Sequence, residues 1–244
     1  MTPKVSVVMI SKNDPENFLR ESIDGFLKQT GVEVELILST IVGDSSIEIA
    51  RSMGVKHIIV NNKAGAYYQL EKGFELVTGD WCCGAGGNDV ALPTKLIDEV
   101  SACLSNVKKI CYSAFYETDE NLNILTTIFL NDYDFDKHIK SNFVADNATI
   151  SVPLLKKYLP FRNFGNYNYY DLWLRIAKGE GTDVFIYNNQ PNFLYRRGHV
   201  ASRLNSKRQS KHIWKMDEQD KKRMLAAHGI IYRTIKYRNR KKIR

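Results

Sequence analysis

The chain has 244 residues, of which 43% are hydrophobic, and this composition supplies enough apolar surface for a sizeable core. The length predicts one large domain, or one domain with an appendage. No apolar run is long enough to cross a membrane, and we expect no secretory signal at the start. The four cysteines form no CxxC pair, which favours buried free thiols in a reducing, cytoplasmic compartment and disfavours a zinc site.

Charge is distributed unevenly along the chain, whose formal net charge is +8. Residues 203–244 carry 15 lysines and arginines against 3 acidic residues, whereas the rest has a small acidic excess. A terminal basic block is typical of segments that bind nucleic acid, anionic lipid or another polyanion; the alternative is a helix whose charges only face solvent. We expect residues 205–244 to form a basic helical extension that binds a polyanion, on nucleic acid or at the periphery of a membrane.

The first hundred residues alternate between strand and helix patterns. Val5–Ile10 is a continuous apolar run, as expected of a strand buried on both faces. Asp14 and Pro15 are expected to begin the next helix as its N-cap and first residue. This β-α-β-α order predicts a mostly parallel sheet with right-handed crossovers. The other predicted strands are 32–38, 57–60 and 81–85, and the other predicted helices are 45–53, 65–77 and 92–104.

The pattern changes after residue 105. Residues 109–116 and 124–129 are predicted to be the two strands of a hairpin. We expect a short helix within 149–158, a helix at 170–177, a strand at 184–187 and a charged helix at 207–227.

Residues 78–94 read TGDWCCGAGGNDVALPT and are the most informative part of the chain. An apolar strand runs into a glycine-rich turn that ends in the polar pair Asn88-Asp89. Glycines let the backbone turn sharply and let a ligand approach closely. A carboxylate just past the carboxyl end of a strand lies where open α/β sheets bind ligands. The alternative is an ordinary strand-to-helix loop.

Several segments, taken in order, resemble the family 2 glycosyltransferases of the GT-A fold. The segments are KVSVVMISKN, ELILSTIVGDSSIEIARSMG, GFELVTGDW, NDVALPTKL and YYDLWLRIAKG, and the similarity extends over about residues 3–204. The resemblance implies an α/β fold, GT-A (Rossmann-like), with a mostly parallel central sheet flanked by helices. We assign residues 1–204 to this domain and residues 205–244 to the basic helical extension.

The resemblance also implies a nucleotide-sugar site. The loop after the first strand, with Ser11 and Asn13, is expected to hold the base. Ser39 stands where the family has an aspartate that contacts the pyrimidine, and its hydroxyl is expected to take that contact. The Asp-x-Asp turn of the family aligns with residues 86–88, so Asn88 and Asp89 are the expected contacts of the ribose and of a divalent cation, Mn²⁺ or Mg²⁺.

Three further residues are implied on the diphosphate side. Arg196 and Arg197 are expected to neutralise the charge that develops on the leaving nucleotide diphosphate. His199, in the same segment, is a candidate metal ligand beside Asp89.

The position of the catalytic base is open in the sequence. The family's Glu-Asp pair aligns with Asn168-Tyr169, and tyrosine is a poor base near neutral pH. Asp171 is the nearest carboxylate, although it would equally suit the N-cap of a helix. Asp146, in the loop FVADNAT, is the second candidate.

The resemblance implies an inverting glycosyltransferase, a hexosyl- or pentosyltransferase, that moves a sugar from a nucleotide-sugar donor, UDP-linked by expectation, to an acceptor hydroxyl. The acceptor is expected to be a glycan or lipid-linked glycan, or a hydroxyl on a modified nucleic-acid base, which the basic tail would help to bind. The alternative is a non-catalytic member of the fold that binds a nucleotide or nucleic acid.

Overall fold

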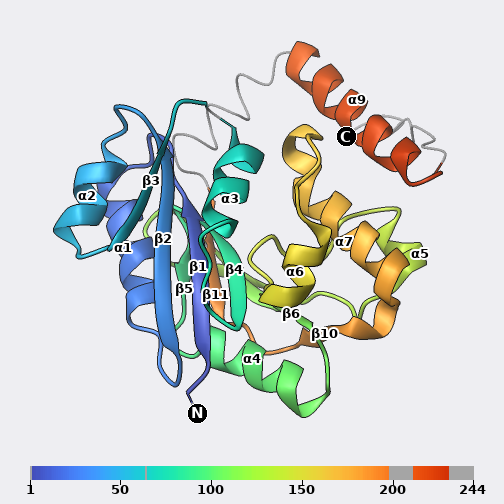
Figure 1. Cartoon of the computed structure of the whole chain (residues 1–244), viewed down its shortest axis with the longest axis horizontal. Coiled ribbons are helices and arrows are strands. Elements are labelled where there is room, and N and C mark those ends of the chain that lie inside the picture. Colours follow the sequence, from blue (N-terminus) through green and yellow to red (C-terminus); the bar gives the residue numbers. More distant parts are fainter. Residues whose placement is uncertain (1, 64, 198–210, 231–244) are drawn as a thin grey trace, which may run out of the picture.

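Two β-sheets organise the chain in the computed structural model, which describes residues 2–63, 65–197 and 211–230 (Figure 1). The larger sheet is made of β1 (Lys4–Ile10), β2 (Glu33–Ile41), β3 (His57–Asn61), β4 (Trp81–Gly86), β6 (Ile110–Ser113), β9 (Thr149–Ser151) and β10 (Phe185–Asn188). The smaller sheet is made of β5 (Val90–Ala91), β7 (Phe115–Thr118), β8 (Ile124–Ile128) and β11 (Phe193–Arg196).

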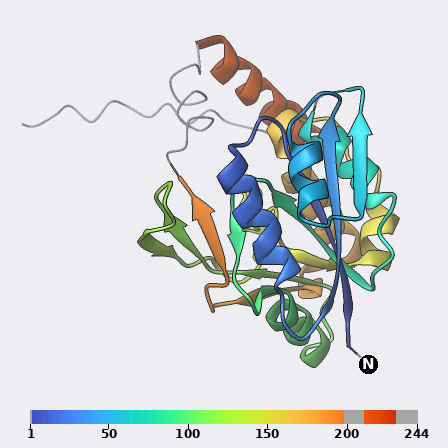
Figure 2. The same ribbon diagram turned by 90° about the vertical axis from the view of Figure 1, so that its left-hand side faces the viewer.

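The larger sheet is mostly parallel, as predicted. Its strand order is β10-β6-β9-β4-β1-β2-β3, and β9 runs antiparallel to both of its neighbours. The inner strand β1 pairs in parallel with β2 and with β4, so the carboxyl ends of these three strands meet at one edge. The smaller sheet has the order β5-β11-β7-β8 and lies beside the first helix, as Figure 2 shows.

Helices cover both faces of the larger sheet. The helices are α1 (Glu16–Leu27), α2 (Ser46–Ser52), α3 (Ala66–Phe74), α4 (Lys95–Ser105), α5 (Phe135–His138), α6 (Val152–Tyr158), α7 (Asn168–Glu180) and α9 (Lys211–Ala227), with short 3₁₀ turns η1 (Gly165–Tyr167) and η2 (Thr182–Val184). One core packs α1, α2 and α4 against the sheet, and the other packs α3, α6 and α7 against the opposite face. Alternate residues of β1 enter the two cores, because side chains of a strand point to opposite faces.

The helix α9 packs against the body of the protein. Met224 and Leu225 are buried in a third cluster with Phe164, Tyr170 and Leu174, which belong to the segment before α7 and to α7 itself. The charged helix predicted at 207–227 is present over residues 211–227, and residues 207–210 lie outside the described part of the chain. None of the helices in the described ranges is long and apolar enough to cross a membrane.

Three sequence-based predictions about local structure are corrected. The strand predicted at 109–116 is two strands in different sheets, β6 and β7, and only β7 forms the hairpin with β8. The strand β9 was not expected within 149–158. Asp14 does not cap α1, which has no side-chain cap, because its carboxylate instead accepts a hydrogen bond from the Ser11 hydroxyl at 2.8 Å.

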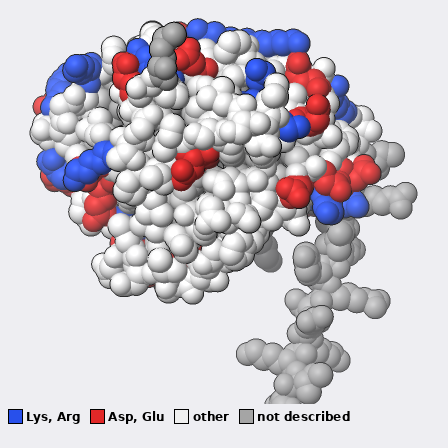
Figure 3. Space-filling view, turned by 90° about the horizontal axis from the view of Figure 1, so that it is seen from below, with Lys and Arg blue, Asp and Glu red and all other residues white. Residues whose placement is uncertain are grey.

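The surface of the body carries both signs of charge. In the view of Figure 3, basic and acidic side chains gather towards the rim, while uncharged surface fills most of the middle. All four cysteines are buried and free, as predicted.

Candidate active site

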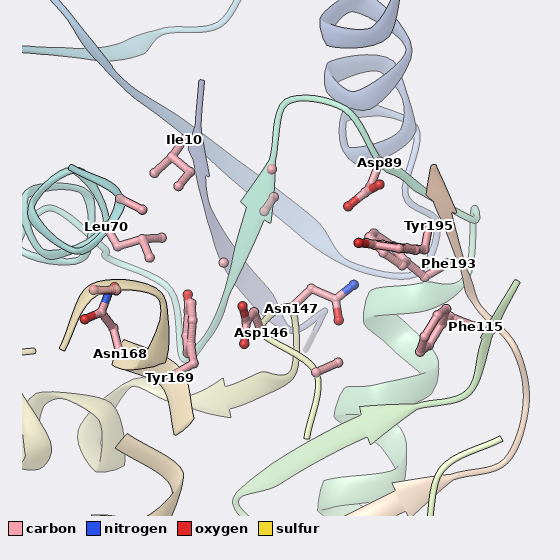
Figure 4. A pocket seen from close by; sticks show the side chains of 16 residues that line it. Ile10, Leu70, Asp89, Phe115, Asp146, Asn147, Asn168, Tyr169, Phe193 and Tyr195 are labelled. Atoms are coloured by element: carbon pink, nitrogen blue, oxygen red, sulfur yellow. The ribbon is translucent and has the colours of Figure 1, made fainter. Parts of the chain in front are cut away.

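A cavity of about 510 Å³ opens at the carboxyl ends of β1 and β4 (Figure 4). Its walls come from these two strands, from α3, from the loop 145–147, from the start of α7, and from β7 and β11 of the smaller sheet. This is the edge at which open α/β sheets bind ligands. The site is therefore assembled from segments that lie far apart in the sequence.

Asp89 lies in the cavity wall, at the end of the glycine-rich turn (Figure 4). Its Oδ1 accepts the backbone N–H of Arg196 at 2.8 Å, which ties the turn to β11. Burial raises the pKa of Asp89 to about 7, although the hydrogen bond from Arg196 acts in the opposite direction. Asp89, which the sequence analysis singled out as a ligand contact, is thus one of the residues that line the cavity.

The turn offers few ligands for the divalent cation that its resemblance implies. No three His, Cys, Asp or Glu side chains of the described residues are grouped so that they could hold a metal ion. A Cβ atom on Gly87 would lie 2.5 Å from Oδ2 of Asp14, so a second carboxylate rests against the turn. Asn88, Asp89 and phosphate oxygens are hard ligands that suit Mg²⁺ or Mn²⁺. The residues therefore fit a cation that donor phosphates help to hold, rather than one bound by protein alone.

The residues expected to hold the base lie beneath the cavity or at its edge. Ser11 and Ser39 are 2% and 0% exposed, and neither lines the cavity. The Ser39 hydroxyl accepts a hydrogen bond from the amide of Asn61 at 3.0 Å. Asn13 is exposed, and its backbone N–H donates to Asp44 at 2.8 Å, which fixes the loop after β1. In this structure the two serines support the loop, and Asn13 is the residue that faces solvent.

The two arginines point away from the cavity. The guanidinium of Arg196 lies 3.9 Å from the centre of the Phe18 ring, pairs with Glu21 and is 2% exposed as a residue. Arg197 is exposed and its Nε lies 3.0 Å from a carboxylate oxygen of Glu117. Both cations thus have protein partners, and neither arginine lines the cavity, although the charge of Arg196 still acts to lower the pKa of Asp89. His199 lies outside the described residues.

Asp146 lies in the cavity beside the start of α7 (Figure 4). The side chain of Asp146 is accessible from the cavity. The protein that surrounds it removes part of its hydration, which raises the pKa of Asp146 to about 6. The loop that carries it is anchored from below, because Nζ of the buried Lys95 donates to the carbonyl oxygen of Asn147 at 3.0 Å. A carboxylate with this pKa is mostly ionised near neutral pH and remains a competent proton acceptor.

Asp171, the first candidate for the base, is fully buried and does not line the cavity. Its carboxylate is bound by Arg162, by Nε of Arg175 at 2.9 Å and by Nε2 of His228 at 2.9 Å. Burial favours a higher pKa, but the hydrogen bonds from His228 and Arg162 outweigh it and lower the pKa of Asp171. This placement corrects the expectation that Asp171 approaches the acceptor, since the carboxylate joins α7 to the end of α9.

An aromatic wall on the opposite side of the cavity was not expected from the sequence. Phe115 of β7 and Phe193 and Tyr195 of β11 line it, and the rings of Phe115 and Tyr195 meet edge to face at 5.8 Å. These residues come together only because β7 and β11 pair in the smaller sheet. The aromatic residues of FLYR favour a strand, but nothing local to this segment indicates its partner β7.

The fold and the cavity define a class of protein, the GT-A glycosyltransferases. Solved structures with the same fold include glucosyl-3-phosphoglycerate synthase from Mycobacterium tuberculosis in complex with Mn²⁺ and UDP, with a TM-score of 0.65, 15% identity, and coverage of 94% of this chain and 81% of that one. They also include TarS of S. aureus in complex with UDP-GlcNAc, with a TM-score of 0.64, 12% identity, and coverage of 91% and 73%.

Sequence comparison narrows the class to one family. The model of glycosyl transferase family 2 matches residues 6–159, and the chain belongs to this family. An uncharacterized glycosyltransferase of Methanocaldococcus jannaschii is 28% identical over 192 residues, which are 73% of this chain and 66% of the relative. The chain thus spans about two thirds of the length of that relative.

Proposed function

We propose that this protein is an inverting glycosyltransferase that moves a sugar from a UDP-linked donor to an acceptor hydroxyl. The observation that carries the proposal is that one cavity joins Asp89, at the turn where the family binds its donor, to Asp146, whose pKa is raised to about 6. Solved neighbours of the same fold bind UDP or UDP-sugars, which supports UDP as the nucleotide.

On the donor side, Asp89 and Asn88 are proposed to face the ribose and diphosphate. A divalent cation held there with the phosphates would neutralise charge on the leaving group. The loop after β1, fixed by Asp44, would border the base. Arg196 contributes through its backbone N–H, which holds Asp89 in place, rather than through its guanidinium.

On the acceptor side, Asp146 is proposed to be the general base. The acceptor oxygen forms a bond to the anomeric carbon while the bond from that carbon to the phosphate oxygen breaks. The proton of the acceptor hydroxyl passes to Asp146, and the electron pair of the broken bond leaves with UDP. Direct displacement of this kind inverts the anomeric configuration.

The aromatic wall of Phe115, Phe193 and Tyr195 suits an acceptor with a flat or apolar face. A sugar ring of a glycan and a modified nucleic-acid base both present such a face. We take a glycan hydroxyl as the proposed acceptor, because a nucleic-acid acceptor depends on residues 231–244, which lie outside the described part of the chain.

The proposal is tested by UDP release from UDP-glucose, UDP-galactose and UDP-N-acetylglucosamine, with and without Mn²⁺. At least one donor is expected to give turnover, and Asp146→Asn is expected to reduce it by about a hundredfold or more, as loss of a general base does. Asp136→Asn is the matched control, because Asp136 is exposed on α5 and does not line the cavity. A protein that binds UDP but releases none from any donor would be a non-catalytic binding member of the family.

A further inference from the structure

The hydroxyl of Tyr169 is a buried polar group without a partner in the described structure. Tyr169 is 8% exposed, lines the cavity, and its hydroxyl makes no hydrogen bond. A buried hydroxyl that makes no hydrogen bond costs stability, so its presence in a cavity wall calls for an explanation. Its ring is well fixed, stacked on Trp173 at 5.6 Å and edge to face with Phe161 at 5.4 Å.

Gly84 of β4 makes room for this hydroxyl. A Cβ atom at residue 84 would lie 2.0 Å from the Tyr169 hydroxyl oxygen and 3.3 Å from the carbonyl oxygen of Asp146. The two residues therefore meet at the same point of β4, and Figure 4 shows their side chains next to each other in the cavity. Any larger residue at position 84 would displace the hydroxyl.

Asp146 is the complementary group. Burial is the only cause that shifts its pKa, so no donor or cation within the described chain stabilises its ionised form. Tyr169 has its pKa raised well above the ordinary value, first by burial and then by the charge of Asp146, so it stays protonated and acts as a hydrogen-bond donor. A donor and an acceptor thus stand close together, and the described residues supply a hydrogen-bond partner to neither of them.

The geometry points to a two-point site for the acceptor hydroxyl, in which Tyr169 donates a hydrogen bond to the acceptor oxygen and Asp146 accepts the hydrogen of that same hydroxyl. An alcohol both donates and accepts, so it satisfies both groups at once, which neither a phosphate nor an ammonium group does. One lone pair of the acceptor oxygen takes the hydrogen bond, and the other attacks the anomeric carbon. Tyr169 is therefore a positioning residue for the acceptor, and this inference rests on the proposed function.

Tyr170 provides a matched control on the same helix. It is 2% exposed, and its hydroxyl donates to the carbonyl oxygen of His138 at 2.5 Å, away from the cavity. Tyr170→Phe removes a hydrogen bond that the protein uses, and it is expected to lower the melting temperature and leave turnover unchanged. Tyr169→Phe removes a hydroxyl without a partner, and it is expected to leave the melting temperature unchanged or raised.

The experiment measures UDP release from the best of the three UDP-sugars, with glycerol varied as the acceptor and with water alone. Tyr169→Phe is expected to raise the KM for glycerol by about tenfold, the value of one hydrogen bond, and to slow hydrolysis by water. Its kcat at saturating glycerol should stay near that of the wild type. The rise of activity with pH through about 6 should be the same in both proteins, because Tyr169 does not bond to Asp146 in the free protein.

Two results would overturn the inference. A Tyr169→Phe protein with the glycerol dependence and hydrolysis of the wild type would mean that the hydroxyl only fills space beside Gly84. A shift of its pH profile to a higher pKa would mean that Tyr169 acts on Asp146 and not on the acceptor. A wild-type protein that releases no UDP from any donor would instead refute the proposed function, so the two failures are distinguishable.

Discussion

His138 gives the structure a stability that depends on pH, which His138→Phe should remove. The residue is fully buried in α5, and neither ring nitrogen has a hydrogen-bond partner among the described residues. Its ring lies 5.0 to 5.1 Å from the rings of Tyr133, Phe143 and Tyr170. In this apolar setting burial lowers the pKa of His138 to about 3 from the ordinary 6.5.

The sign and size of the effect follow from these two pKa values. When folding lowers the pKa of a group, the folded state has its full stability above the unfolded pKa, which is 6.5 for His138. Stability is then lost as the pH falls towards the lower pKa of the folded state. At pH 5 the unfolded chain binds a proton at His138 and the folded chain does not, and this difference lowers the free energy of unfolding by about 2 kcal/mol. At pH 7.5 both states leave His138 neutral, so the loss in free energy of unfolding is close to zero.

The assay is urea unfolding of wild type and His138→Phe at pH 7.5 and pH 5. Relative to the wild type, the variant is expected to gain about 2 kcal/mol in free energy of unfolding between the two pH values. Asp89 and Asp146, whose raised pKa values act in the opposite direction, are present in both proteins and cancel in the difference. A difference that does not change with pH would show that His138 is not held neutral in the folded protein.

Three other predictions concern the ion pairs and the tail. Asp171→Asn should lower the free energy of unfolding by about 2 to 3 kcal/mol, because it leaves two arginines without their carboxylate, and UDP release by the folded protein should persist. Lys95→Met should destabilise by about 3 to 5 kcal/mol, because Glu99 stays buried without its partner at 2.7 Å, as chemical denaturation would show. Deleting residues 231–244, which include six basic residues between 233 and 242, should weaken binding to duplex DNA or anionic vesicles and make that binding less dependent on salt. Equal binding by the full-length and truncated proteins at low salt would contradict a role for the tail.

The first half of the fold was predictable because its signals are local. The run Val5–Ile10 is buried in the middle of the sheet, and β2, β3 and β4 lie within a few residues of their predicted bounds. The later strands are short and depend on partners far away in the sequence. Nothing in residues 109–116 marks Ala114 as the point where the chain passes from one sheet to the other, and β5 has only two residues.

The residues of the site also fall into those that local sequence could place and those that it could not. Asp89 follows a strand and a glycine turn, so its position was readable from the sequence. Asp171 lies in the first turn of α7, where the sequence alone suggested a helix cap or a base. Its partners Arg162 and His228 come from outside that helix, and His228 lies 57 residues away in the chain. The local pattern gave its place in α7 correctly and carried no information about what would surround it.

A base at Asp146, as proposed, would explain how this chain replaces the carboxylate that the family resemblance implies at the start of α7. The resemblance aligns Asn168 and Tyr169 with the family's Glu-Asp pair, and both residues line the same cavity as Asp146 of the loop 145–147. That loop is held between the buried residues Val144 and Ala148, and Lys95 binds its backbone from below. These contacts support the loop, and a catalytic group needs such support from its surroundings to keep its geometry. Under this proposal the proton acceptor lies on the loop rather than on the helix, and the Tyr169 hydroxyl is left to hold the acceptor.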